Sequence, residues 1–406
     1  MTCSVLCVTA VFALAACKPA LTCDGTHSCP SVTMEDKLKN LDNGFSGMAR
    51  IDANNFLVVH DYKNYADDLR RRRLGIVNLH HNRLTAKYDY RDIVNQNHDR
   101  QIEGWPRVTS ADSGGVANDL ESACALHGLA NQFLIAESST YNTGDEKVGG
   151  RLFRVTVDSA LRTYEVADHA EHLPGLHPET GNYMQNVHSR FEQQSLENYE
   201  GLACWQRPDG KYIVLLGERG ATMPESDGVP YETFERTEGS LQWAIFDPSN
   251  NLYAWQTPFN GINAPGMQVN GDPRCWRDIS GLHIDDDRKI WATAAYDAAL
   301  DDQTGADPCN SNETRPADGR PYSVVYLLGA ICEYKGDRVL SNGACRESAI
   351  YPRPVVLSSF SVNRRVDGYK IEAIAAPQGN GMSALTIASE DETDIPDEKG
   401  GSWWNR

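Results

Sequence analysis

The sequence predicts an all-β fold, a single β-propeller made of blades of four antiparallel strands. A hairpin pattern recurs along the chain, starting at residues 46, 121, 200, 280 and 372, with turn residues at each midpoint. A second pair of strand-like runs follows most of these hairpins, and the 33 Gly and 19 Pro of the 406 residues suit short strands joined by turns. A repeated four-stranded unit is typical of a propeller blade. We therefore expect five blades, with six blades as the alternative.

Each recurring hairpin contains two apolar runs around a polar turn. The five hairpins span residues 46–61, 121–137, 199–218, 280–297 and 372–390. Second hairpins follow at 75–90, 150–169 and 239–259, the fourth blade continues with the runs 322–331 and 354–362, and the fifth has GGSWWNR at 400–406. We expect a strand from residues 30 to 42 to complete this last blade, because a four-stranded unit lacks one strand there.

The N-terminus resembles an export signal. Residues 1–16 form an uncharged apolar stretch that is too short to span a bilayer and ends in small residues, as a signal peptide does. The run Leu14-Ala15-Ala16-Cys17 resembles a bacterial lipobox, so Cys17 is the candidate lipidation site, and an ordinary secretory signal is the alternative. We expect a lipid-anchored linker with the candidate closing strand at 17–43, the propeller domain at 44–406, and a location in the bacterial cell envelope.

The cysteines also suit an exported chain. Eight cysteines follow Cys17, an even number that is typical of an oxidising compartment. Cys124 and Cys204 lie inside apolar runs and are expected to be buried free thiols. The disulfide candidates are Cys23 with Cys29, Cys275 with Cys309, and Cys332 with Cys345.

The charge balance excludes some partners. The chain has 38 Lys plus Arg against 56 Asp plus Glu, a net charge of -18. Such a field repels nucleic acid and anionic lipid surfaces and favours cations. We expect no nucleic-acid partner, a membrane contact only through the N-terminal lipid, a small-molecule or envelope ligand of unknown identity, and a monomer.

Acidic residues recur at the ends of the hairpins. Glu200 and Glu218 are placed symmetrically about the turn at residue 209, so a regular register would put them opposite each other, with a repulsion of about 3 kcal/mol. Because equivalent strand ends of a propeller surround one mouth of its channel, these acids are expected to converge there and bind Ca²⁺, with Mg²⁺ or Mn²⁺ as alternatives. Capping of backbone N–H groups by the same carboxylates is the alternative. The predicted metal ligands are Glu121, Glu137, Glu200, Glu218, Glu372, Glu390 and Asp61, while Ser46 and Ser280 hold the equivalent place in two hairpins.

Other candidate residues are fewer. The candidate substrate-binding residues are Arg219, His60, Arg50 and His283, with Lys63 as a further basic group, and no catalytic residue can be named. The run 70–73 is interpreted as a solvated basic edge, with a contact to phosphate or lipid headgroups as the alternative. His169, His172, His177 and His188 fall in an expected loop and form a weak metal motif. A GxSxG motif and a Walker-type phosphate loop are absent from the sequence.

The acid-bearing motifs resemble a known family. NDLESACAL with FLIAES, NYEGLACW with IVLLGE, and KIEAIAAP with LTIASE are similar to the pattern of the esterase-like phytase (phytase-like) family and of the related SdiA-regulated propellers. The resemblance covers about residues 44–404 and implies an exported bacterial propeller with a metal-dependent phosphoesterase activity. The matching positions are Glu121, Glu137, Glu200, Glu218, Glu372 and Glu390, and the chain departs from the pattern at Ser46, Ser280 and Ala295 or Asp297.

Two functions follow as expectations. The first is a metal-dependent hydrolase of phosphoesters, in which the acids hold the ions and activate water. The second is a non-catalytic propeller that binds a ligand or envelope partner and uses calcium only structurally. An open coordination position beside a basic residue would distinguish the first from the second.

Overall fold

The structure is a computed structural model of the whole chain. The residues that it describes are 31–32, 36–37, 45–60, 73–80, 87–96, 105, 120–141, 147–173, 175–176, 183–184, 199–220, 238–265, 267, 276–296, 322–333, 337–339, 345–347, 354–367, 369–376, 385–389 and 402–405.

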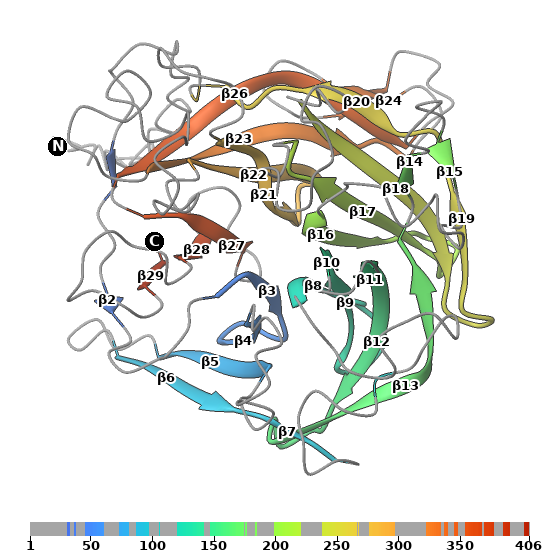
Figure 1. Cartoon of the computed structure of the whole chain (residues 1–406), viewed down its shortest axis with the longest axis vertical. Helices are drawn as coiled ribbons and strands as arrows, with labels where there is room; N and C mark the ends of the chain where they lie inside the picture. The colour runs from blue at the N-terminus through green and yellow to red at the C-terminus, as the bar shows by residue number, and fades with distance from the viewer. Residues whose placement is uncertain are drawn as a thin grey trace, which may run out of the picture.

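The described part of the chain is all-β, and its larger sheets are arranged around a common centre (Figure 1). The innermost strands are β3 (Gly47–Arg50), β8 (Leu120–Ala125), β16 (Tyr199–Gln206), β21 (Trp276–Ile284) and β27 (Ile371–Ala375). Each of these strands contacts the next in this order, and β27 contacts β3, so the strands close a ring. The predicted all-β propeller is confirmed.

Each inner strand pairs with the next strand of the chain in an antiparallel hairpin. The partners are β4 (Asn55–Val59), β9 (Gln132–Glu137), β17 (Tyr212–Glu218), β22 (Lys289–Tyr296) and β28 (Thr386–Ser389). The recurring hairpins are therefore present where the sequence predicts them. The fourth begins earlier than expected, because Trp276 and Arg277 already pair with Tyr296 and Ala295.

The outer strands complete the sheets. They are β5 (Leu74–His80) and β6 (Lys87–Asp92); β12 (Arg151–Val157) and β13 (Thr163–His172); β18 (Gly239–Asp247), β19 (Leu252–Trp255) and β20 (Phe259–Ile262); β23 (Tyr322–Ile331) and β26 (Val355–Asp367); and β29 (Ser402–Asn405). Figure 1 shows β6, β13 and β26 at the periphery of the ring.

Short strands pair at the sheet edges. β1 (Ser31–Val32) is parallel to β26, β7 (Val94–Asn95) is parallel to β13, and β2 (Asp36–Lys37) is antiparallel to β29. The segment expected to supply a closing strand thus contacts both the last sheet and the one before it. Separate pairs are β10 (Ser139–Tyr141) with β11 (Lys147–Gly149), β14 (Gly175–Leu176) with β15 (Tyr183–Met184), and β24 (Asp337–Val339) with β25 (Cys345–Glu347).

The hydrophobic core lies between neighbouring sheets. One cluster of buried side chains joins Leu57 of β4 to Phe133 of β9, and another joins Leu215 of β17 to Ile290 of β22. A further cluster joins Phe56 of β4 to Ala388 of β28, across the seam where the last sheet meets the first. Burial of apolar side chains on each seam therefore stabilises the closed ring.

Glycines allow the inner strands to approach closely. A Cβ atom on Gly47 would lie 2.4 Å from the Cα of Ser122 on β8. A Cβ atom on Gly201 would lie 2.7 Å from the Cγ of Leu282 on β21. The glycines that follow Ser46 and Glu200 in the sequence are thus explained by packing at the centre of the ring.

One disulfide overturns a prediction. Cys124 of β8 and Cys204 of β16 are bonded to each other, with their Cα atoms 5.5 Å apart. The expectation of buried free thiols was wrong, because neighbouring inner strands bring these two positions together although 80 residues separate them. Cys332 is also disulfide-bonded, and the predicted pairing with Cys345 stays a prediction.

Several N-terminal and loop predictions fall outside the described residues. They concern the signal peptide at 1–16 and the residues Cys17, Cys23, Cys29, Cys275 and Cys309. Within the described residues, the structure contains no helix with the length and apolar character needed to cross a membrane.

Candidate functional site

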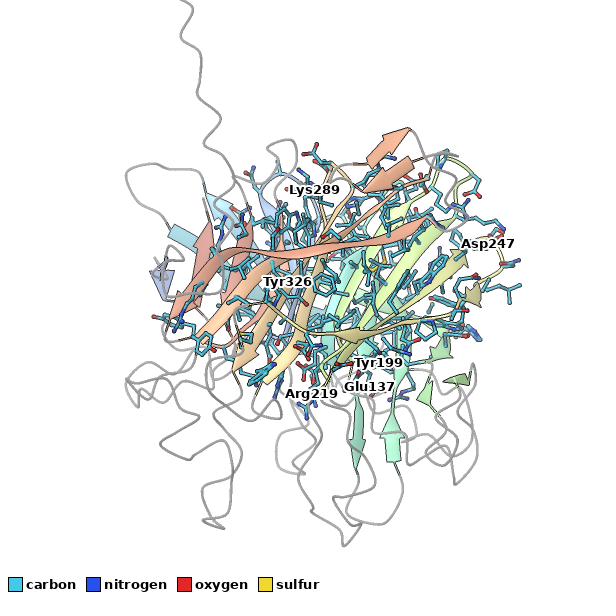
Figure 2. All side chains as sticks on the ribbon, turned by 90° about the horizontal axis from the view of Figure 1, so that it is seen from above. Glu137, Tyr199, Arg219, Asp247, Lys289 and Tyr326 are labelled. Carbon is cyan, nitrogen blue, oxygen red and sulfur yellow. A yellow bond between two sulfur atoms is a disulfide. The ribbon has the colours of Figure 1, made fainter. Side chains whose placement is uncertain are left out.

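The predicted metal ligands that the structure describes lie at one end of the inner hairpins. Glu121, Glu200 and Glu372 lie near the first residue of their inner strands, and Glu137 and Glu218 end the partner strands. All five side chains are at most 5% exposed. Figure 2 shows Glu137, Tyr199 and Arg219 at the same end of the molecule, with Lys289 toward the other end. We call the charged residues at this end the mouth cluster.

A β-bulge keeps Glu200 from lying directly opposite Glu218. Gly201 pairs with Gly217 as the midpoint at residue 209 predicts, but the register then shifts and Tyr199 pairs with Glu218. The same shift occurs at Glu121 and at Glu372. Each of these three glutamates is therefore the extra residue of a bulge, which turns it away from the partner strand. The expectation that Glu200 lies directly opposite Glu218 was wrong for this reason.

Arg277 joins two of the bulged glutamates. Its Nη1 lies 2.7 Å from Oε1 of Glu200 and 2.8 Å from Oε1 of Glu372, so these two oxygens are at most about 5.5 Å apart. Lys370 Nζ lies 3.1 Å from the same oxygen of Glu372, and Arg219 Nη1 lies 3.2 Å from Oε1 of Glu200. The acids are thus neutralised by cations of the protein itself.

Glu137 and Glu218 are also held by protein donors. Arg151, the first residue of β12, binds Glu137 through two hydrogen bonds, one of them 2.6 Å from Nη2 to Oε1. Both side chains are fully buried. The backbone N–H of Gly220 donates to Oε1 of Glu218 at 3.1 Å, which agrees with the alternative that strand-end carboxylates cap backbone groups.

Glu200 has one oxygen that is not engaged. Its Oε1 accepts from both Arg219 and Arg277, whereas Oε2 is buried and has no hydrogen-bond partner among the described residues. A buried carboxylate oxygen without a partner is costly. Such an atom is a candidate for contact with a ligand.

Asp278 carries a carboxyl group with a raised pKa beside the cluster. Burial raises its pKa to about 7, although the backbone N–H groups of Ala264 and Gly239 donate to it at 2.7 and 3.1 Å. Its own backbone N–H donates to the carbonyl oxygen of Arg219 at 2.7 Å. Asp278 therefore ties β21 to the segment that carries Arg219.

The first hairpin has His60 where two others have glutamate. His60 follows β4, and the regular pairing of Gly47 with Val59 gives it the place of Glu137 and Glu218. It is 3% exposed, and its Nε2 lies 2.8 Å from the hydroxyl oxygen of Tyr90. Tyr90 donates in turn to Oδ1 of Asp92 at 2.6 Å.

Two predicted site residues lie at the opposite end of the inner hairpins. Arg50 is the last residue of β3 and pairs with Asp286 in the turn after β21, at 3.2 Å. His283 precedes the same turn, and burial together with the nearby charge of Arg50 lowers its pKa to about 3. The structure does not bring Arg50 and His283 together with the mouth cluster.

Other predictions are corrected or lie outside the described residues. Arg73 is only 3% exposed, so the solvated-edge interpretation was wrong for it. His169 and His172 lie in β13 rather than in a loop, so the expected loop position was wrong for these two residues. The predictions at Asp61, Lys63, His177, His188, Glu390, Asp297 and 70–72 fall outside the described residues.

The described acids do not fit a calcium site. Calcium takes six to eight oxygen ligands, but Glu137, Glu200 and Glu372 each form an ion pair with a nitrogen atom of arginine or lysine. Among the described residues, no group of three or more His, Cys, Asp or Glu could hold a metal ion. Calcium stays a prediction, and we assign no step to it.

Sequence reasoning missed the cations. Apart from Arg219, the residues that neutralise the acids were not predicted, although Lys370 is only two positions before Glu372. Arg277 is 77 residues from Glu200 and 95 residues from Glu372, so only the closed ring brings these groups together.

Comparisons with known proteins identify no family by sequence. No family model matches the chain, and no curated protein matches it. Solved structures with low similarity include a GH43 β-xylosidase/α-arabinofuranosidase from a compost microbial metagenome, with 10% identity, 93% of this chain and 94% of that chain covered, and a TM-score of 0.43. A GH43 β-1,3-galactosidase has 7% identity, 92% and 94% coverage, and a TM-score of 0.41. An exo-1,5-α-L-arabinanase from a bovine ruminal metagenomic library has 11% identity, 90% and 91% coverage, and a TM-score of 0.37.

These findings correct the family and the functions expected from sequence. The phytase-like assignment was wrong: no family model supports it, and the structures found are those of glycoside hydrolases. The expected phosphoesterase and the alternative of a non-catalytic binding module are corrected with it. The motif was misleading for two reasons. Its glycine allows close packing of the inner strands, and its glutamate lies in a bulge and pairs with arginine.

Proposed function

We propose that this chain is a glycoside hydrolase whose reactive centre is the mouth cluster around Glu200. The observation that carries the proposal is the pair of carboxylates Glu200 and Glu372, whose Oε1 atoms lie within about 5.5 Å of each other on either side of Arg277. Glycoside hydrolysis needs carboxylates close to the scissile bond, where positive charge develops on the sugar.

The charges of the cluster favour an uncharged ligand with many hydroxyl groups. Acids and cations alternate here, as in the series Arg219, Glu200, Arg277, Glu372 and Lys370. A polyanion would meet the carboxylates, and a polycation would meet the guanidinium groups. Sugar hydroxyls both donate and accept, so they can satisfy both kinds of group.

Glu200 is the carboxylate best placed to act on such a ligand. Arg219 and Arg277 fix the carboxylate through Oε1 and leave Oε2 for contact with the sugar or with an attacking water. Groups held in one geometry before the substrate binds lower the cost of reaching the transition state.

The test is hydrolysis of a panel of nitrophenyl glycosides, including xylosides, arabinosides and galactosides. We expect the wild type to cleave at least one of them and Glu200→Gln to lose that activity. Asp209→Asn is the matched control, because Asp209 lies in the turn of the same hairpin at its other end. If the wild type cleaves none of the glycosides, the proposed function is wrong.

Two further proposals concern the whole molecule. We propose five blades, formed by the sheets whose inner strands are β3, β8, β16, β21 and β27, which the contacts of β27 with β3 support. We also propose export to an oxidising compartment, which the disulfide between Cys124 and Cys204 supports.

A further inference from the structure

The two arginines that hold Glu200 are both linked to one buried aspartate. The guanidinium groups of Arg277 and Arg219 donate to Oε1 of Glu200, at 2.7 and 3.2 Å. Arg277 directly precedes Asp278 on β21, and Arg219 directly follows β17 of the neighbouring sheet. The backbone N–H of Asp278 donates to the carbonyl oxygen of Arg219 at 2.7 Å. Asp278 is therefore connected to one donor of Glu200 through the chain and to the other through a hydrogen bond.

The side chain of Asp278 binds two further segments at this end of the molecule. Its Oδ2 accepts from the backbone N–H of Gly239 at 3.1 Å, and its Oδ1 accepts from that of Ala264 at 2.7 Å. Gly239 begins β18, and Ala264 lies two residues after β20. Both strands belong to the sheet of β16, whereas Asp278 belongs to the sheet of β21. One fully buried carboxyl group thus bridges the seam between two sheets beside the mouth cluster.

The backbone of Asp278 is also held from its own sheet. The hydroxyl of Tyr326, on β23, donates to the carbonyl oxygen of Asp278 at 2.7 Å. The register of β21 against β22 shifts between Arg277 and Gly281, and Asp278 lies within this shift rather than in the regular pairing. Side-chain hydrogen bonds therefore help to fix the chain where the strand ladder is irregular.

Two glycines leave room for the carboxyl group of Asp278. A Cβ atom on Gly220 would lie 2.6 Å from the backbone nitrogen of Gly239 and 3.0 Å from Oδ2 of Asp278, and the φ of Gly220 is +88°. A Cβ atom on Gly239 would lie 2.9 Å from the Cβ of Asp278. Because both positions are glycine, the chain directly after Arg219 can pass close to Asp278.

We propose that Asp278 is a positioning residue, which holds Arg219 and Arg277 in the direction that leaves Oε2 of Glu200 available to a ligand. Its role in catalysis rests on the proposed glycoside hydrolysis. Asp278 itself is placed away from the sugar, since its side chain is fully buried and both of its oxygens accept from the backbone. Because a misplacement of about 1 Å can lower a rate about 10²-fold, a residue that sets these two donors can control kcat without touching the substrate.

Hydrogen–deuterium exchange tests the positioning without any substrate. We would compare the full-length wild type with Asp278→Asn by mass spectrometry. The amide of asparagine keeps the size of the side chain and one acceptor oxygen, but it turns N–H groups toward the second backbone donor. Exchange should therefore become faster in the peptides that contain the backbone N–H groups of Gly239, Ala264 and Asp278.

Asp285→Asn is the matched control. Asp285 is a buried aspartate that follows the same strand at its other end, where it accepts from the backbone N–H of Lys289 at 2.9 Å and from the indole N–H of Trp291 at 2.8 Å. This variant should accelerate exchange in its own turn only. Unchanged exchange in Asp278→Asn, or equal acceleration around Asp278 in the control variant, would overturn the positioning role.

Kinetics separate this inference from the proposed function. If a glycoside is cleaved, Asp278→Asn should lower kcat about 10–10²-fold with little change in KM, because a misdirected Glu200 affects the transition state more than binding. Asp285→Asn should leave both constants unchanged. An unchanged kcat in the folded Asp278→Asn variant would overturn the role in catalysis. If no glycoside is cleaved, the proposed function is rejected, whereas the exchange result still decides whether Asp278 holds the segment that carries Arg219.

Discussion

The first and third inner hairpins differ in how the ends of their two strands pair. The hairpin of β16 and β17 has glutamates at both strand ends, and its register shifts so that Glu200 becomes the extra residue of a bulge. The hairpin of β3 and β4 has Ser46 and His60 at those ends, and its pairing stays regular. Bulges also occur at Glu121 and Glu372. The register also shifts in the hairpin of β21 and β22, between Arg277 and Gly281, where Ser280 holds the equivalent place. The comparison teaches that the bulge at Glu200 comes with a pairing to arginine, whereas the end with Ser46 and His60 keeps a regular register.

Removing Arg277 should have the largest effect on stability of the changes considered. Arg277→Met leaves Glu200 and Glu372 buried without their shared partner, which should lower the free energy of unfolding by about 3–5 kcal/mol. Denaturant unfolding of both proteins measures this change. Arg50→Met is the control, with an expected loss of about 1 kcal/mol or less, since its partner Asp286 is 45% exposed. Equal losses in the two variants would show that Arg277 stabilises the folded chain no more than a surface ion pair does.

The disulfide adds a covalent link to the third hairpin that the first lacks among the described residues. It joins β8 to β16, so Cys124→Ala with Cys204→Ala should lower the free energy of unfolding by about 2–4 kcal/mol. Thermal unfolding of this variant against the wild type, both without reductant, gives the value. An unchanged melting temperature would contradict a role for the bond in holding this seam together.

The pH dependence of the unfolding free energy tests the contacts of Asp278, which binds the segment that carries Arg219. The pKa of Asp278 is about 7 in the folded chain and has an ordinary value of 3.8, so the folded state binds more protons between these pH values. The contribution of Asp278 to stability should therefore decrease as the pH rises from about 4 to about 7, by at most about 1.4 kcal/mol per pH unit. The difference in unfolding free energy between the wild type and Asp278→Asn, followed across this range, reports it. A difference that is constant with pH would mean that Asp278 does not titrate there.

Metal removal should have the smallest effect. Since Glu137, Glu200 and Glu372 are paired with arginine and lysine, EDTA should leave the melting temperature of the purified protein unchanged. A calcium ion present at 100 times its dissociation constant would contribute about 2.7 kcal/mol, which the same scan would detect. A clear fall of the melting temperature with EDTA, reversed by calcium, would return the acids to the role of metal ligands.

The sequence was most informative about local structure. Alternating apolar runs around Pro208-Asp209-Gly210 predict the third hairpin and most of its register, because turn chemistry and strand pairing act over few residues. The contact of Glu200 with Arg277 was not predictable, since Arg277 reaches this position only when the ring closes. The bond between Cys124 and Cys204 was missed for the same reason, although both lie in inner strands of consecutive repeats.

The resemblance of motifs was a weaker guide than the contacts of the residues within them. In NYEGLACW, the glycine is explained by its contact with Leu282 and the glutamate by its contacts with Arg219 and Arg277. Neither contact requires a phosphate or a metal. A short motif can therefore recur because inner strands of a ring need it, whatever the protein does.

The ratio of kcat/KM between the wild type and Glu200→Gln tests the central claim most directly. It should be measured on the glycoside that the wild type cleaves fastest, with circular dichroism to show that the variant is folded. A catalytic carboxylate at this position predicts a fall of about 10²–10⁴-fold. A folded variant that retains activity within about tenfold of the wild type would contradict the assignment of Glu200 and of the mouth cluster as the reactive centre.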